Sequence, residues 1–236
     1  MKFLQPNVQG ESEERQQAST SGSSRTRLNR AAIFVDAEYF RISCLGEIAD
    51  GFISSTSKLI KYVQDNIEGV QHIDRWRCFA YDAKYVGRAE SFAHPADRVT
   101  RKKMHRMLLD AGFTVRFGSY VLRDIRVVGD VKSTRVIVQK EVDTMIVVDA
   151  MREAFTVGAD TLIFITGDSD FIPLFRELRV RKKTVILLHG DENTVSQQLI
   201  RTSSQALQIV RTSGYRSVQQ RLSNIPAVAG RGVRAR

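Results

Sequence analysis

Cysteine is scarce in this chain of 236 residues, and that scarcity excludes two classes of protein. Cys44 and Cys78 are the only two cysteines, too few for a disulfide framework or a zinc cluster. Both lie in or near apolar segments, which indicates small buried side chains rather than reactive thiols. Reduced, buried cysteines fit the cytoplasm, so we expect a cytoplasmic protein.

Long apolar runs are also absent. No run approaches the roughly 18 residues of a membrane span, so we expect no membrane partner. The first residues, MKFLQPNVQGESEERQQ, contain no apolar stretch of the kind that a secretory signal needs. The four histidines show no metal-ligand spacing, and we assign none of them a catalytic role.

Positive charge is plentiful but unevenly distributed. The net charge is +10, and residues 211–236 carry six arginines and no acid. Residues 1–28 are rich in Gln, Ser, Glu and Arg, which is typical of a flexible segment. We therefore expect a flexible leader over residues 1–28, a folded domain over 29–210 and a basic, disordered tail over 211–236. Such a tail attracts nucleic acid without sequence specificity, or serves solubility alone.

Between these ends, short apolar strands alternate with amphipathic helices. The pattern predicts strands at 31–35, 75–81, 162–165 and 185–188, and helices at 56–67, 96–111, 141–157 and 170–182. Residues 113–117 and 121–128 read as two strands that could form a hairpin, 134–139 as a third, and 194–208 as a helix or helix and strand. Alternation of this kind predicts a mostly parallel α/β sheet covered on both faces.

Four acids fall where those strands end or the next helices begin. Asp36 and Asp168 follow apolar strands, whereas Asp143 and Asp170 stand at helix starts. Ligands of open parallel sheets bind in the crevice beyond the carboxyl ends of the strands. Each acid alone could be a turn residue or an ordinary acid at a helix N-terminus. Together, they form the oxygen donor set that Mg²⁺ and Mn²⁺ prefer.

Three segments carry a family resemblance: FVDAEYF, QKEVDTMIVVDAM and DTLIFITGDSDFIPLFRELRVRKKTVIL. They resemble the NYN domain of the LabA-like group, within the PIN-like nuclease superfamily, over about residues 31–210. TGDSDF is the most specific part. The resemblance implies a PIN-like three-layer α/β/α sandwich around a mainly parallel sheet. It also implies a Mg²⁺- or Mn²⁺-dependent ribonuclease, an endoribonuclease that hydrolyses RNA phosphodiester bonds with activated water, and it suggests a homodimer.

Residue roles follow from the same motif match. The resemblance gives metal binding and catalysis to Asp36, Asp143, Asp168 and Asp170, and contact with substrate phosphate to Lys140 and Thr166. Asp149 also fits the family pattern. However, it lies about 240° around the helix from Asp143, so we expect a structural role. Two positions depart from the pattern, because Tyr39 stands where asparagine is common and Glu141 where glycine is common.

An acidic metal centre needs cations beside it to hold nucleic acid. In the helix predicted over residues 96–111, a basic stripe occurs at i, i+3, i+4 and i+7: Arg98, Arg101, Lys102 and His105. From this stripe we predict Arg101 and Lys102 as substrate-binding residues. The alternative is an ordinary solvated helix face.

Three functions fit these observations. The first is the metal-dependent ribonuclease, which retention of all four acids favours. The second is a catalytically weak or inactive NYN-fold module that binds RNA or regulates, which the departure at Tyr39 favours. The third is another acidic-site phosphotransfer enzyme, of TOPRIM-like or haloacid-dehalogenase-like type. The sequence Asp36-Ala37-Glu38 after the first strand disfavours the haloacid-dehalogenase pattern, which has its D-x-D there.

Overall fold

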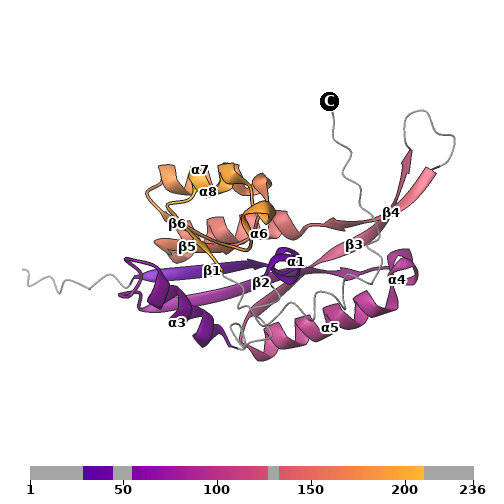
Figure 1. The fold of residues 1–236 in the computed structure, drawn as a ribbon, viewed down its shortest axis with the longest axis horizontal. Helices are drawn as coiled ribbons and strands as arrows, with labels where there is room; N and C mark the ends of the chain where they lie inside the picture. Colours follow the sequence, from indigo (N-terminus) through magenta and orange to yellow (C-terminus); the bar gives the residue numbers. More distant parts are fainter. Residues whose placement is uncertain (1–28, 45–54, 127–132, 210–236) are drawn as a thin grey trace, which may run out of the picture.

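The computed structural model describes residues 29–44, 55–126 and 133–209 (Figure 1). In this part of the chain, seven strands form one sheet in the order β4-β3-β2-β1-β5-β6-β7. Neighbouring strands are parallel except for β3 and β4, which are antiparallel. The strands are β1 (Arg30–Asp36), β2 (Arg75–Tyr85), β3 (Thr114–Arg126), β4 (Ser133–Lys140), β5 (Thr161–Ile165), β6 (Thr184–His189) and β7 (Gln205–Gln208).

Helices cover both faces of the sheet, which confirms the predicted three-layer α/β/α architecture (Figure 1). One layer contains α1 (Ala37–Ser43), α3 (Thr56–Asn66) and α5 (Pro95–Asp110), with the short α4 (Arg88–Phe92) near the end of α5. The other contains α6 (Val142–Arg152), its π-helical extension Glu153–Val157, α7 (Ile172–Val180) and α8 (Gln197–Thr202).

The central strands are buried on both sides, which explains their uninterrupted apolar sequences. Ile33 of β1 packs into the core under α1, α3 and α5, whereas its neighbour Phe34 packs into the core under α6 and α7. The Phe34 ring stacks on Phe79 and Phe164, with centroid distances of 5.6 and 5.0 Å. Strands in a parallel sheet read as continuous hydrophobic runs for this reason.

Two details of the predicted strand pattern are wrong. The residues predicted as two strands belong, over 114–117 and 121–126, to one continuous strand, β3, and the hairpin is formed by β3 and β4. Gly118 looks like a break in the sequence, but it is needed because a Cβ atom there would lie 2.2 Å from the Lys140 carbonyl oxygen. The short helices α1 and α4 were not predicted, since few residues separate them from the preceding strand.

The predicted leader and tail lie outside the described residues. Within the described residues, the longest helices are too short or too polar to cross a lipid bilayer.

Candidate metal centre

The order of the strands reverses between β1 and β5, and this switch point lies beside the predicted site. The chain runs from β1 to β2 on one side of β1, then returns to place β5 on the other side. Val35 and Ile165 are partners in the parallel register. Asp36 and Thr166 therefore leave the sheet at the same level, at the edge where α/β sheets bind ligands.

Asp36 is held in place by the beginning of α1. Its Oδ1 accepts hydrogen bonds from the backbone N–H groups of Glu38 and Tyr39, at 3.1 and 3.2 Å, so it is the N-cap of that helix. Its Oδ2 accepts a hydrogen bond of 3.4 Å from the Thr166 hydroxyl. These contacts fix the carboxylate at the end of β1.

The segment TGDSDF forms a tight turn that places two acids at the end of β5. Thr166 is 2% exposed, and its hydroxyl oxygen accepts a hydrogen bond of 3.3 Å from the Asp168 N–H group. Asp168 is the N-cap of a 3₁₀ turn, and its Oδ1 accepts from the Asp170 N–H group at 2.9 Å. The Thr166 hydroxyl thus links the two residues, because it donates to the Asp36 carboxylate and accepts from the Asp168 N–H group.

Asp143 lies in the first turn of α6 and is exposed. The N-cap residue of this helix is Glu141, whose φ of 77° is in the left-handed region. Most L-amino acids avoid this region, whereas glycine adopts it freely. This backbone geometry would suit glycine, and it leaves Glu141 strained.

The pKa shifts of Asp36 and Asp143 indicate which acids lie within electrostatic reach of these two carboxylates. Burial is the largest of the causes that raise the pKa of Asp36 to about 7. The charges of Asp143, Glu38 and Asp168 add to this rise, and the hydrogen bond from the Tyr39 N–H group opposes it. Burial also raises the pKa of Asp143, with added contributions from Asp168 and Asp170. Like charges at short range disfavour ionisation, so this cluster stores repulsion that a cation would relieve.

The donor chemistry fits a hard divalent cation. Carboxylates and a hydroxyl are the oxygen ligands of Mg²⁺ and Mn²⁺. In the described part of the chain, no ion pair joins Asp36, Asp143, Asp168 or Asp170 to a basic side chain. Nor do the described residues contain three acidic, His or Cys side chains already gathered closely enough to hold a metal ion. Asp143, Asp168 and Asp170 are exposed, whereas Asp36 is half-buried.

A family comparison matches the NYN domain over residues 30–209, which is most of the chain. This chain belongs to the NYN domain family. NYN domains have a PIN-like nuclease fold and are generally nucleases. Among solved structures, the chain is similar to a protein of unknown function from Vibrio parahaemolyticus, with 20% identity and a TM-score of 0.49 over 78% of this chain and 95% of that one. The comparison with curated proteins gives no match.

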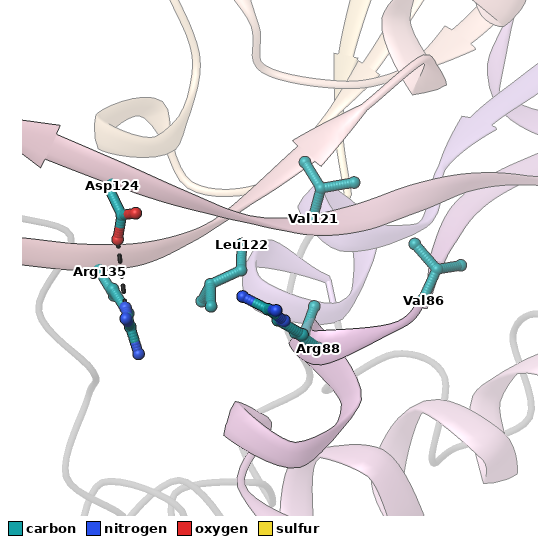
Figure 2. A pocket seen from close by; sticks show the side chains of 7 residues that line it. Val86, Arg88, Val121, Leu122, Asp124 and Arg135 are labelled. Carbon is teal, nitrogen blue, oxygen red and sulfur yellow. Dashed lines mark hydrogen bonds and ion pairs between the residues drawn. The ribbon is translucent and has the colours of Figure 1, made fainter.

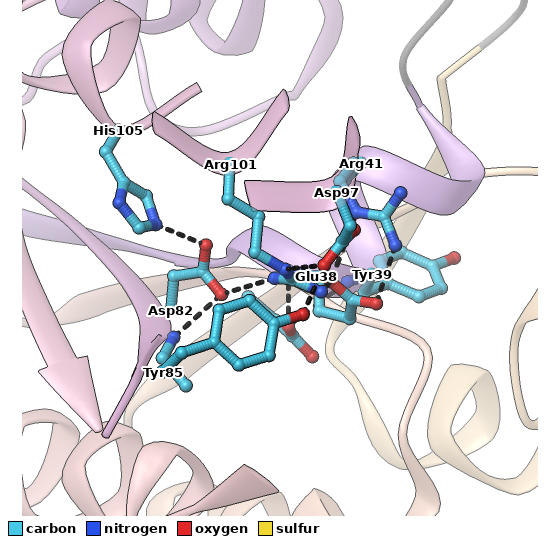
Figure 3. Close-up of polar contacts among 10 residues, drawn as sticks. Glu38, Tyr39, Arg41, Asp82, Tyr85, Asp97, Arg101 and His105 are labelled. Atoms are coloured by element: carbon cyan, nitrogen blue, oxygen red, sulfur yellow. Dashed lines mark hydrogen bonds and ion pairs between the residues drawn. The ribbon is translucent and has the colours of Figure 1, made fainter. Parts of the chain in front are cut away.

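The prediction of one exposed basic stripe on the NYN domain's α5 is wrong for Arg101 and His105. Arg101 is 6% exposed, and its guanidinium pairs with Glu38, Asp82 and Asp97 at 2.7, 3.0 and 3.0 Å (Figure 3). His105 lies 2.6 Å from the other oxygen of Asp82. Three carboxylates occupy the guanidinium, so Arg101 is a buried structural cation and is not free to bind phosphate.

The structure gives the positions of the remaining predicted residues, and their predicted roles stay predictions. Lys102 is exposed on α5, and Lys140 is half-buried at the end of β4, opposite Ser119. Asp149 is 3% exposed, accepts a hydrogen bond of 2.9 Å from the Tyr81 hydroxyl and pairs with Arg116 and Arg152. Those contacts agree with the predicted structural role for Asp149.

Tyr39 has a role that the sequence did not indicate. Its hydroxyl accepts a hydrogen bond of 2.9 Å from the Gly190 N–H group and lies 3.2 Å from the Thr194 hydroxyl. Its ring packs so tightly on Gly167 that a Cβ there would lie 2.3 Å from the ring. Tyr39 therefore braces the turn that carries Asp168, where an asparagine would leave a gap. A hint lay in the glycine of TGDSDF, since a close approach needs a residue without a side chain.

Proposed function

We propose that this NYN domain is a metal-dependent ribonuclease of the LabA-like group, which hydrolyses RNA phosphodiester bonds with Mg²⁺ or Mn²⁺. The observation that carries the proposal is the position of Asp36 beside Thr166 at the strand-order switch, with Asp143 and Asp168 close enough to raise its pKa. Burial and neighbouring carboxylates disfavour the ionised forms of Asp36 and Asp143, and a bound cation would favour them.

Four carboxylates would hold the metal: Asp36, Asp143, Asp168 and Asp170. A bound Mg²⁺ or Mn²⁺ would activate water and neutralise charge on the scissile phosphate. The Thr166 hydroxyl keeps Asp36 and the Asp168 turn in register, and Lys140 supplies a cation near the start of α6 for substrate phosphate. Cytoplasmic localisation and a homodimer stay predictions.

Cleavage assays test this function directly. Labelled single-stranded and structured RNAs are incubated with protein in Mn²⁺, Mg²⁺ or EDTA, beside an Asp143→Asn variant. We expect metal-dependent cleavage by the wild type and its loss in the variant, because the substitution removes one charge and one oxygen ligand. Cleavage that persists in EDTA, or in a folded Asp143→Asn protein, would contradict the metal mechanism.

A second candidate is an RNA-binding module with weak or no cleavage. It is favoured by the absence of a gathered three-ligand group in the described residues and by Tyr39 in place of asparagine. A wild-type protein that binds RNA but leaves it intact in Mn²⁺ would select this alternative.

A further inference from the structure

A pocket of about 230 Å³ lies between α4 and the hairpin formed by β3 and β4 (Figure 2). Its apolar lining includes Val86, Val121 and Leu122. Its polar lining consists of the guanidinium groups of Arg88 and Arg135 and the carboxylate of Asp124, which is 3.2 Å from Arg135 Nε. Apolar walls with a few oriented polar groups are typical of small-molecule and nucleobase sites.

The pocket belongs to the same end of the sheet as the four aspartates. Asp36 is level with Tyr81 and Arg116 in the strand register. Val121 lies farther along β3, and Val86 directly follows β2, each five residues beyond that level, or about 17 Å at the usual rise of a strand. Lys140 is opposite Ser119, at a level between the aspartates and the pocket. A strand of nucleic acid leaving the aspartates along this edge would meet Lys140 and then the pocket.

The surface around the pocket combines exposed apolar side chains with cations. Phe92 is 52% exposed and Val86 is 43% exposed. The Arg135 guanidinium lies 5.8 Å from the centre of the Phe92 ring. Arg88 has no ion pair among the described residues. Exposed aromatic rings beside arginines are the combination with which proteins stack bases and neutralise phosphates of single strands.

We propose that this pocket binds a nucleobase of single-stranded RNA, and that guanine is the preferred base. Guanine offers acceptors at O6 and N7 to an arginine, and N–H donors on its opposite edge to a carboxylate. Arg88, Arg135 and Asp124 supply both kinds of partner. The inference rests on the proposed function and deepens it, since it names the substrate feature that the enzyme reads.

Binding without cleavage tests the pocket. Fluorescence anisotropy is measured in EDTA with Asp143→Asn protein and short labelled uridine RNAs, with or without one central guanosine. We expect the added guanosine to tighten binding about tenfold, and Arg88→Ala with Arg135→Ala to remove that gain. Replacing both arginines by lysine should keep the charge but lose the preference, because lysine lacks the bidentate geometry.

A matched control separates the pocket from general charge. Arg106 is another exposed arginine that pairs with an aspartate, Asp110, on α5 away from the pocket. Arg106→Ala should leave the guanosine preference unchanged. Two results would overturn the proposal. One is equal binding of the two uridine RNAs by the Asp143→Asn protein. The other is an equal effect of Arg106→Ala and Arg135→Ala on the guanosine preference.

The two proposals can fail separately. RNA cleavage by wild-type protein together with no guanosine preference would overturn the pocket and keep the nuclease. Guanosine-dependent binding together with no cleavage in Mn²⁺ would keep the pocket and overturn the nuclease.

Discussion

Two clusters of carboxylates lie side by side at one edge of the sheet, and they are built in opposite ways. In the first, Asp82 is fully buried but shares Arg101 with Glu38 and Asp97. In the second, Asp36 and Asp143 have no ion pair with a basic side chain in the described residues. Burial and neighbouring carboxylates raise the pKa of both side chains.

The two clusters also differ in what balances their charge. Burial opposes the charge on Arg101, yet Glu38, Tyr120, Asp82 and Asp97 raise its pKa above the ordinary arginine value. That cluster is complete without any ligand. Under the proposed function, a cation from solution would complete the Asp36 cluster. We therefore assign stability to the first cluster and propose metal binding for the second.

The largest expected effect is on the Arg101 cluster. Arg101→Met would leave the buried Asp82 without its arginine, with only His105 and a backbone N–H group beside it. It should lower the free energy of unfolding by about 3–5 kcal/mol. Urea unfolding measures this change. The exposed Arg106→Ala serves as control and should cost less than about 1 kcal/mol. A loss below about 1 kcal/mol for Arg101→Met would mean that the network does not stabilise the fold.

The next effect concerns the pH dependence of stability at Asp36. Its pKa is raised from 3.8 to about 7, so the folded state keeps this proton after the unfolded chain has lost it. Asp36 therefore favours the folded state below pH 4, and that contribution is lost as the pH rises to about 7. The full shift corresponds to about 4 kcal/mol, which partial solvent exposure reduces to roughly 1–2 kcal/mol.

Asp36→Asn removes this titration. In metal-free buffer, the variant should be more stable than wild type at pH 8 by roughly 1–2 kcal/mol, and little different at pH 4. Urea unfolding at the two pH values gives the comparison. A variant that is less stable than wild type at pH 8 would indicate that ionised Asp36 supports the fold.

A smaller effect is expected at Tyr39. Tyr39→Phe keeps the ring against Gly167 but removes the acceptor of the Gly190 N–H group, which should cost about 1 kcal/mol. Differential scanning calorimetry measures the loss of stability. If the hydroxyl also positions the Asp168 turn, the rate of RNA cleavage should fall in the same variant. Unchanged stability would show that water replaces the hydroxyl.

The smallest effect is expected at Lys102. This side chain is exposed on α5, and no ion pair holds it within the described residues. If Lys102 contacts a phosphate, Lys102→Ala should weaken RNA binding about twofold and reduce the salt dependence of binding by about one charge. Binding curves at several salt concentrations check this. An unchanged salt dependence would remove this face of α5 from the substrate path.

The sequence predicted those features that depend on local pattern. Apolar runs such as Leu162–Ile165 mark buried parallel strands because both of their faces are covered. The acids that follow them fall at one edge because parallel strands share a direction. The positions of Asp36 and Asp168 could therefore be predicted without coordinates.

Features that depend on pairing across the fold could not be predicted. Arg101 and Lys102 are adjacent on one helix, and only the position of Asp82 on β2 decides that the first is buried. Likewise, nothing local in Tyr39 shows that its ring lies against Gly167. Long-range partners decide whether a charged side chain is structural or free.

Calorimetric titration of Mn²⁺ into metal-free protein at pH 8 tests the contrast between the two clusters most directly. We expect the wild type to bind Mn²⁺, Asp168→Asn to lose that binding, and Asp97→Asn, from the Arg101 cluster, to retain it. Absence of Mn²⁺ binding by the folded wild type, or equal binding by all three proteins, would contradict the assignment of Asp36, Asp143, Asp168 and Asp170 as a metal centre.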